Sequence, residues 1–191
     1  PGHQAFTAMR ARGANITDLV IIVVAADDDV MPQTIEAIDH AQAASVPIII
    51  AINKIDKPAA NADKIFKKLS DYKILVEEWG GKYQSQLISA KTGSGIDDLL
   101  EKVLLESEVL DLKAPDQVNG SCMIVESKLD KGLGPIATAL VQKGSIKKGQ
   151  IFSCGTQASK IRLLLDERGK EVDIAYPSDP IQILGFESVP N

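Results

Sequence analysis

The sequence predicts two successive fold classes, a parallel α/β domain and then an all-β domain. In residues 1–112, apolar β-branched runs alternate with stretches of helical period, as in βαβ units. After Pro115 the pattern changes to short β-rich runs that are separated by Gly and Pro turns. We therefore predict an α/β domain over 1–112, a linker over 113–119 and a β-barrel domain over 120–191.

The predicted elements of the first domain alternate along the chain. The apolar run 18–26 predicts a central parallel strand covered on both faces, and the run 47–52 predicts a second buried strand. Pro32 suits the first position of a helix, because the missing N–H would have no intrahelical partner there. Apolar spacing predicts helices over 4–12, 32–41, 62–70 and 96–106, and the run 86–88 predicts a further strand.

Short runs of β-forming residues make up the second domain. Gly or Pro turns separate them, and this spacing favours a small antiparallel barrel. Cys122 and Cys154 lie in or beside these runs, match no metal-ligand spacing, and are expected to behave as small buried apolar residues. The runs are 122–127, 136–142, 150–153, 160–165, 171–174 and 181–186.

Composition limits the classes of function. The chain has 191 residues, of which 45% are hydrophobic, and a net charge of −5. Residues 1–112 hold 11 Lys+Arg and 17 Asp+Glu, a net of −6, whereas residues 113–191 hold 10 and 9, a net of +1. Neither part is a basic arm, so no DNA binding is expected. The sequence shows no signal peptide and no apolar run of spanning length, which predicts a soluble intracellular chain without membrane contact.

The tetrapeptide Asn53-Lys54-Ile55-Asp56 directly follows the run 47–52. It therefore lies at the carboxyl end of a predicted parallel strand, where open α/β sheets bind ligands. Asp56 can accept hydrogen bonds from guanine N1–H and the 2-amino group, whereas adenine would leave a buried Asp56 unpaired. The Lys54 stem can lie along the base, and the Asn53 amide can tie the loop to neighbouring backbone. Taken alone, the motif is equally compatible with a strand-to-helix turn.

A second polar loop, Ser89-Ala90-Lys91, follows the run 86–88 and leads through Thr92-Gly93-Ser94-Gly95 into a helix. It has the same strand-end context as the first loop. A backbone N–H offered at Ala90 would meet guanine O6 and oppose the amino group of adenine. No metal site is predicted. The predicted guanine-binding residues are Asn53, Lys54, Asp56, Ser89, Ala90 and Lys91.

Pro1-Gly2-His3 opens the chain. These residues resemble the end of the D-x-P-G-H signature of translational GTPases, whose Asp would precede Pro1. The resemblance implies that Gly2 senses the γ-phosphate and that His3 is catalytic, because it positions the attacking water. Without the other two motifs, a lone terminal His would be interpreted as a solvated surface residue.

Over nearly its whole length, the chain resembles the bacterial and organellar translation initiation factor two family. It implies a partial P-loop GTPase G domain followed by a barrel of the translation-factor type. It also implies that the parent protein hydrolyses GTP and acts with the ribosome and initiator tRNA, in the bacterial cytoplasm or in the matrix of a mitochondrion or plastid. The matching segments are 1–14, 24–28, 30–38, 51–58, Glu77-Glu78-Trp79-Gly80-Gly81, 129–132 and 134–135.

The sequence contains no G-x-x-x-x-G-K-[ST] phosphate loop. The resemblance implies that this loop and the Mg²⁺ ligand belong upstream of Pro1, and that tRNA-binding domains belong beyond Asn191. GTP or GDP with Mg²⁺ is therefore expected to bind the intact parent, whereas these 191 residues alone are expected to bind no nucleotide tightly and to hydrolyse no GTP. Asp29 occupies a position where the family usually has Gly. If this position needs a positive φ, the backbone strain should be small, because Asp tolerates a positive φ better than most residues do.

Two alternatives stay open on sequence alone. An elongation-factor-like GTPase shares the nucleotide motifs, but the stretch Glu77–Gly81 is not expected in it. A non-catalytic module that binds the ribosome or another partner could keep the fold and lose nucleotide turnover. A phosphate loop encoded upstream of Pro1 would count against this second alternative.

Overall fold

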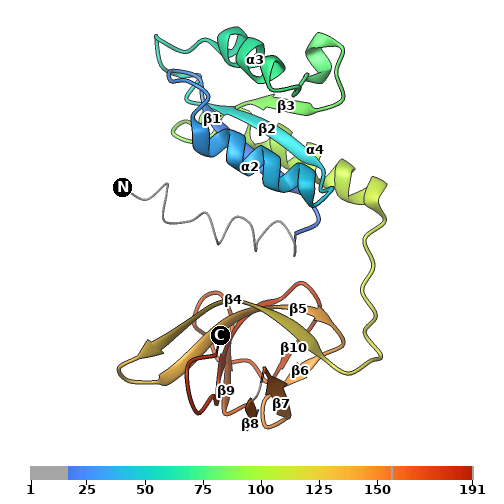
Figure 1. Ribbon diagram of the computed structural model, residues 1–191, viewed down its shortest axis with the longest axis vertical. Coiled ribbons are helices and arrows are strands. Elements are labelled where there is room, and N and C mark those ends of the chain that lie inside the picture. Colours follow the sequence, from blue (N-terminus) through green and yellow to red (C-terminus); the bar gives the residue numbers. More distant parts are fainter. Residues whose placement is uncertain (1–16, 156, 191) are drawn as a thin grey trace. The chain divides into compact units, whose positions relative to one another are not determined.

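The computed structural model describes residues 17–155 and 157–190 (Figure 1). By its internal contacts the chain divides into two compact units, Pro1–Leu112 and Lys113–Asn191. The first is an α/β unit with parallel strands and the second is built from antiparallel strands, which confirms the two predicted fold classes. The predicted helix over 4–12 lies outside the described residues.

The first unit contains a parallel sheet in the order β1-β2-β3 (Figure 1). Because the strands are parallel, their carboxyl ends lie along one edge of the sheet. The elements in chain order are β1 (Val20–Ala25), α2 (Pro32–Ala43), β2 (Ile48–Asn53), α3 (Ala62–Asp71), the 3₁₀ helix η2 (Glu77–Trp79), β3 (Gln84–Leu87) and α4 (Ile96–Leu110).

β2 is the buried centre of this sheet. No residue from Ile48 to Ile52 is more than 5% exposed. One face packs against α2 and α3, and the other face packs against Leu99 of α4. A strand covered on both faces needs apolar residues at successive positions, and the Ile-rich run supplies them.

β1 differs from its prediction as a strand covered on both faces. Ile22 and Val24 are buried, whereas Ile21 is 38% and Val23 is 56% exposed. The apolar cluster around α4 takes residues from β2 but none from β1. Within the described residues, β1 pairs only with β2, so it is the edge strand of this sheet and one of its faces is largely uncovered.

The second unit contains a four-stranded sheet in the order β4-β5-β11-β9 and two two-stranded sheets, β6-β10 and β7-β8. Their side chains share one apolar core, in which Ala137, Val141, Leu164 and Ile183 are buried. The described strands do not pair into one closed sheet, so the predicted barrel closure is not seen in them. The strands are β4 (Ser121–Asp130), β5 (Gly134–Lys143), β6 (Ile146–Lys147), β7 (Ile151–Cys154), β8 (Gln157–Lys160), β9 (Leu163–Leu165), β10 (Ile174–Ala175) and β11 (Pro180–Leu184).

The run 160–165, predicted as one strand, is broken in the structure. β8 ends at Lys160 and β9 begins at Leu163. Between them, the Ile161 N–H donates to the Gln150 carbonyl at 2.9 Å, and the Arg162 N–H donates to the Leu184 carbonyl at 2.8 Å. The chain therefore passes from the β7-β8 hairpin to the four-stranded sheet within two residues.

Both cysteines are half-buried free thiols that pack against the core of the second unit. Burial, together with the nearby Cys154, raises the pKa of the Cys122 thiol. In the described part of the chain, no group of three or more His, Cys, Asp or Glu side chains could hold a metal ion. None of the helices in this part is both long and apolar enough to span a membrane.

Candidate functional site

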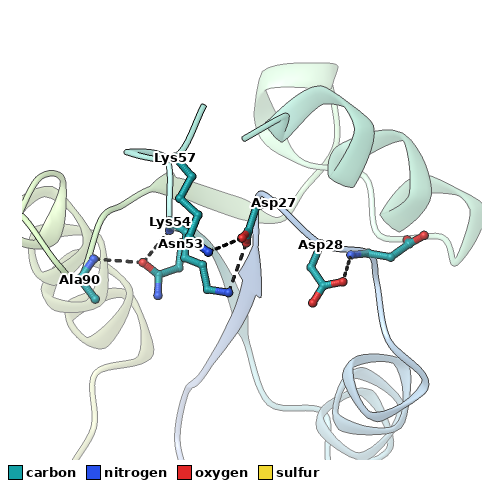
Figure 2. Close-up of polar contacts among 7 residues, drawn as sticks. Asp27, Asp28, Asn53, Lys54, Lys57 and Ala90 are labelled. Atoms are coloured by element: carbon teal, nitrogen blue, oxygen red, sulfur yellow. Dashed lines mark hydrogen bonds and ion pairs between the residues drawn. The ribbon is translucent and has the colours of Figure 1, made fainter. Parts of the chain in front are cut away.

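The two polar loops predicted from the sequence lie side by side at the carboxyl edge of the parallel sheet. The Ile88 N–H donates to the Ile52 carbonyl at 2.8 Å, and the Ile55 N–H donates to the Ile88 carbonyl at 3.3 Å. Beyond the strand ends, the Ala90 N–H donates to Asn53 Oδ1 at 3.0 Å (Figure 2). Residues 37 positions apart in the sequence are thus joined directly.

Asn53 fixes the shape of its own loop. Its Oδ1 accepts a second hydrogen bond from the Lys54 N–H at 2.7 Å. Lys54 has a φ of +66°, in the left-handed region that residues other than glycine seldom occupy. The expectation that the Asn53 amide ties this loop to neighbouring backbone is confirmed. Within the described residues no hydrogen bond uses its Nδ2 group, which leaves a donor for a ligand.

The same contact corrects the prediction for Ala90. Its N–H was expected to be open to guanine O6, whereas it is directed at Asn53 Oδ1. An amide N–H has one hydrogen, so a ligand acceptor would have to share it or take another donor. The Ala90 donor is therefore part of the bond between the loops, which sequence spacing could not reveal.

Asp56 and Ser89 form the second link between the loops. The Ser89 hydroxyl donates to Asp56 Oδ1 at 2.6 Å and accepts from the Thr92 N–H at 3.2 Å. Ser89 is only 1% exposed, so its hydroxyl is well fixed. The Ser89 hydrogen bond is the main cause that holds the pKa of Asp56 below its usual value, and the charges of Lys91 and Lys57 add to it. Asp56 is therefore ionised at neutral pH.

Asp56, which was expected to be buried, is exposed in the structure. It lies past the end of β2, which ends at Asn53. An ionised carboxylate offers about four lone-pair positions, so one hydrogen bond from Ser89 leaves acceptors for a ligand. The carboxylate is thus charged, oriented from one side and open on the other.

A third loop, which follows β1, completes this edge of the sheet. The Ala26 N–H donates to the Asn53 carbonyl at 2.7 Å. The Asp27 carboxylate forms an ion pair with each of two lysines: Oδ1 lies 3.2 Å from Lys54 Nζ, and Oδ2 lies 2.5 Å from Lys57 Nζ (Figure 2). The Lys57 hydrogen bond holds the pKa of Asp27 below its usual value, and Asp27 raises the pKa of Lys57.

Sequence reasoning missed Asp27 and Lys57 as members of the site. Asp27 directly follows the apolar run 18–26, just as Asn53 follows the run 47–52. The strand-end rule that selected Asn53 therefore carried the signal for Asp27 as well. Nothing in the sequence pattern indicated Lys57, because its role depends on its distance from Asp27.

Asp29 does not have a positive φ, so the small backbone strain expected for an Asp with positive φ is absent. Its carboxylate accepts from the Val30 N–H at 2.7 Å and forms an ion pair with Lys68 of α3. These two contacts hold the Asp29 pKa below its usual value, with Lys68 as the main cause. Asp29 is therefore tied to a helix rather than to the two polar loops.

A cavity of about 690 Å³ lies along β1 in the first unit. Its lining includes apolar residues of β1 and α2 together with Asp28 and Lys54. The first polar loop, through Lys54, therefore borders an open space next to the edge strand. Gly2 and His3, the predicted γ-phosphate and catalytic residues, lie outside the described residues.

Comparisons with known proteins agree with this arrangement. A family model described as the elongation factor Tu GTP binding domain matches residues 1–108, and one described as elongation factor G domain 2 matches residues 119–191. Translation initiation factor IF-2 of Chlorobium limicola is 60% identical over the whole chain, and that of Chloroherpeton thalassium is 58% identical. The chain spans 20% and 18% of these two relatives.

Solved structures show the same fold. The crystal structure of GDP-bound aIF5B from Aeropyrum pernix has a TM-score of 0.78 and 25% identity, and the match covers 97% of this chain and 39% of that one. The apo form of translation elongation factor SelB from Methanococcus maripaludis has a TM-score of 0.73 and 24% identity, over 91% and 37% of the two chains. The chain therefore belongs to the elongation factor Tu GTP-binding family of translational GTPases, and it resembles translation initiation factor IF-2 throughout its length.

Proposed function

We propose that this chain recognises the guanine base within a translation initiation GTPase. The observation that carries the proposal is the joining of Asn53 to Ala90 and of Asp56 to Ser89 at one sheet edge. These contacts put an oriented, ionised carboxylate and an amide whose Nδ2 makes no hydrogen bond within the described residues on the same pair of joined loops. Guanine presents donors at N1 and the 2-amino group, and an acceptor at N7, so its edge is complementary to this pair of groups.

Each predicted site residue has a role in this proposal. Asp56 accepts from N1–H and the 2-amino group, while the Ser89 hydroxyl keeps its carboxylate in place. The Lys54 stem covers the face of the base. Asn53 uses Nδ2 as a donor, and the loop Ser89–Lys91 supplies donors to O6, with Ala90 sharing its hydrogen or Lys91 offering its own N–H.

The residues described here fit the base of GTP or GDP, and no ligand set for phosphate or Mg²⁺ is proposed among them. A bound Mg²⁺ ion would neutralise charge on the phosphates. Gly2 and His3 keep their proposed roles in sensing the γ-phosphate and positioning the attacking water. The domain limits keep their proposed form as well, with part of the G domain over 1–112, a linker over 113–119 and the β domain over 120–191.

The proposed parent protein promotes binding of initiator tRNA to the small ribosomal subunit and hydrolyses GTP when the subunits join. The support is the match of the whole chain to initiation factors, which also favours this function over that of an elongation factor. The named relatives are bacterial proteins, so we place the parent in the bacterial cytoplasm rather than in an organelle.

The substitution Asp56→Asn in the full-length protein tests this proposal. An amide in place of the carboxylate cannot accept both guanine donors, so GDP affinity should fall by about 100-fold or more. Xanthosine diphosphate, which presents a carbonyl in place of the 2-amino group, should bind the variant better than GDP does. Equilibrium titration with both nucleotides measures this change.

The control is Asp63→Asn, which removes the same charge from an exposed position in the first turn of α3. It should leave GDP affinity unchanged. Asp56→Asn protein that still prefers guanine as the wild type does would rule out the assignment of this edge as the base site.

A further inference from the structure

The two lysines that meet at Asp27 both come from the loop that follows β2. Lys54 belongs to the Asn53–Asp56 tetrapeptide, whereas Lys57 follows it. We propose that Asp27 is a positioning residue for nucleotide binding. Before the nucleotide binds, it orients the Lys54 side chain so that the stem can cover the face of the base. Lys57 in turn holds the Asp27 carboxylate in place. The inference rests on the proposed guanine site.

Lys54 and Lys57 share the Asp27 carboxylate. The Asp27 side chain is only 15% exposed, whereas those of Lys54 and Lys57 are 43% and 48% exposed. Each oxygen serves a different ammonium group: Lys57 takes Oδ2 at 2.5 Å, and Lys54 lies 3.2 Å from Oδ1. A largely buried carboxylate needs such partners, because an unpaired buried charge is costly. Asp27 therefore keeps both lysine tips at one point.

Lys54 is fixed at both ends. At its backbone, the N–H donates to Asn53 Oδ1 and the residue is held at φ +66°. At its tip, Nζ is held by Asp27 (Figure 2). The hydrogen bond from the Ala26 N–H to the Asn53 carbonyl fixes the distance between the loop after β1 and the loop after β2. With both ends fixed, the four-carbon stem has little freedom left.

Removal of the Asp27 carboxylate would leave the two lysines without their shared partner. Two ammonium groups would then face each other with no anion between them, and Lys54 would move into solvent. Nucleotide binding would have to order this side chain again, at a cost that a preorganised loop avoids. Because losses of this kind appear mainly in the dissociation rate, the nucleotide should leave faster while its association rate changes little.

The experiment measures release of fluorescent GDP, labelled on the ribose, from the full-length protein. Asp27→Asn should release it about fivefold faster, the size expected for a partly exposed ion pair. Asp27→Glu, which keeps the charge, should recover part of the loss. Asp29→Asn is the matched control, because it neutralises an ion-paired aspartate of the same loop whose partner, Lys68, lies on α3. Its release rate should equal that of the wild type.

A second readout separates positioning of Lys54 from general damage to the loop. Inosine diphosphate lacks the 2-amino group that Asp56 binds, so the ratio of GDP to inosine diphosphate affinity reports on Asp56. Asp27→Asn should lower both affinities equally and keep this ratio, whereas a collapsed loop would reduce it. In a Lys54→Met background, Asp27→Asn should add nothing, because the two changes remove one interaction.

The outcomes distinguish the two proposals. A wild-type protein that does not bind GDP would overturn the proposed function itself. A wild type that binds GDP, with Asp27→Asn releasing it no faster than Asp29→Asn, would overturn only the role of Asp27. Additive effects of Asp27→Asn and Lys54→Met, or a changed GDP to inosine diphosphate ratio, would also overturn it.

Discussion

Asp27 and Asp56 of the first unit are held differently from Asp130 and Asp166 of the second. In the first unit, Asp27 and Asp56 bind the side chains of residues 30 and 33 positions away in the sequence. In the second unit, Asp130 and Asp166 accept hydrogen bonds from backbone N–H groups two to four residues further along the chain. The first arrangement joins separate strand ends, and the second closes single turns.

This difference indicates where a ligand site can form. Asp130 Oδ1 accepts from both the Gly132 and the Leu133 N–H groups, which hold its pKa below the usual value. The pKa of Asp56 is lowered too, but mainly by one hydroxyl from another strand end. A lowered aspartate pKa is therefore common to both units. What distinguishes the candidate site is that its contacts span the sheet and leave acceptors open.

The largest expected effect tests how far the first unit depends on its central strand. Ile50 is fully buried at the centre of β2, so Ile50→Ala should destabilise this unit by about 3 kcal/mol through lost burial and a cavity. Trp79, the only Trp in the sequence, packs against Phe66 and reports unfolding by its fluorescence in urea. Val109→Ala is the control, because Val109 is 80% exposed and its change should cost under about 0.5 kcal/mol.

The same variant sharpens the comparison between the units. If the contacts of Asp27 and Asp56 depend on the strands they join, hydrogen exchange at the strand ends of the first unit should accelerate in Ile50→Ala. The local turns of the second unit should exchange at unchanged rates. Equal acceleration in both units would mean that their stabilities are coupled.

A smaller effect is expected at a turn of the second unit. Gly144 has a φ of +59°, and a Cβ there would lie 2.2 Å from the Val118 carbonyl oxygen. Gly144→Ala should therefore cost about 2 kcal/mol, from left-handed strain and from the clash together. Gly155 has a φ of +56° with no atom within 4 Å of its Cβ position, so Gly155→Ala should cost only about 1 kcal/mol.

Hydrogen exchange of the buried β5 amides measures both glycine variants. The two φ values are nearly the same, so both variants carry similar left-handed strain. The difference between their stability losses therefore measures the cost of the clash at Gly144 alone. The Gly144 N–H donates to the Pro115 carbonyl at 2.7 Å, so residues 113–119 lie against this turn. Equal losses of stability in the two variants would show that residues 113–119 move aside freely.

The smallest effect concerns pH and the local turn at Asp130. Its folded pKa is depressed, so its charge contributes stability that is present above the usual value of 3.8 and is lost as pH falls through the folded pKa. Asp130→Asn keeps an acceptor oxygen but has no charge. The wild type should therefore protect the Leu133 amide better than the variant at neutral pH, and the two should converge in acid. A difference that persists in acid would contradict this cause.

The sequence by itself determined the local features of the molecule. Apolar periodicity predicted β2 and the helices α2, α3 and α4, because burial on one or two faces leaves its period in the sequence. The strand-end rule placed the loop after β2 and the loop after β3 at one edge, because parallel strands share their direction. Turn residues predicted the change to antiparallel structure after Pro115.

Only the tertiary structure decided the contacts between distant residues. Pairing of β2 with β1 and β3 brings Asp27 to Lys57, and Ala90 to Asn53, across 30 and 37 positions of sequence. The same pairing leaves β1 at the edge of the described sheet, and the second unit breaks the run 160–165 where the chain changes sheets. The physical reason is that periodicity records which residues are buried, whereas strand neighbours and register decide which of them meet.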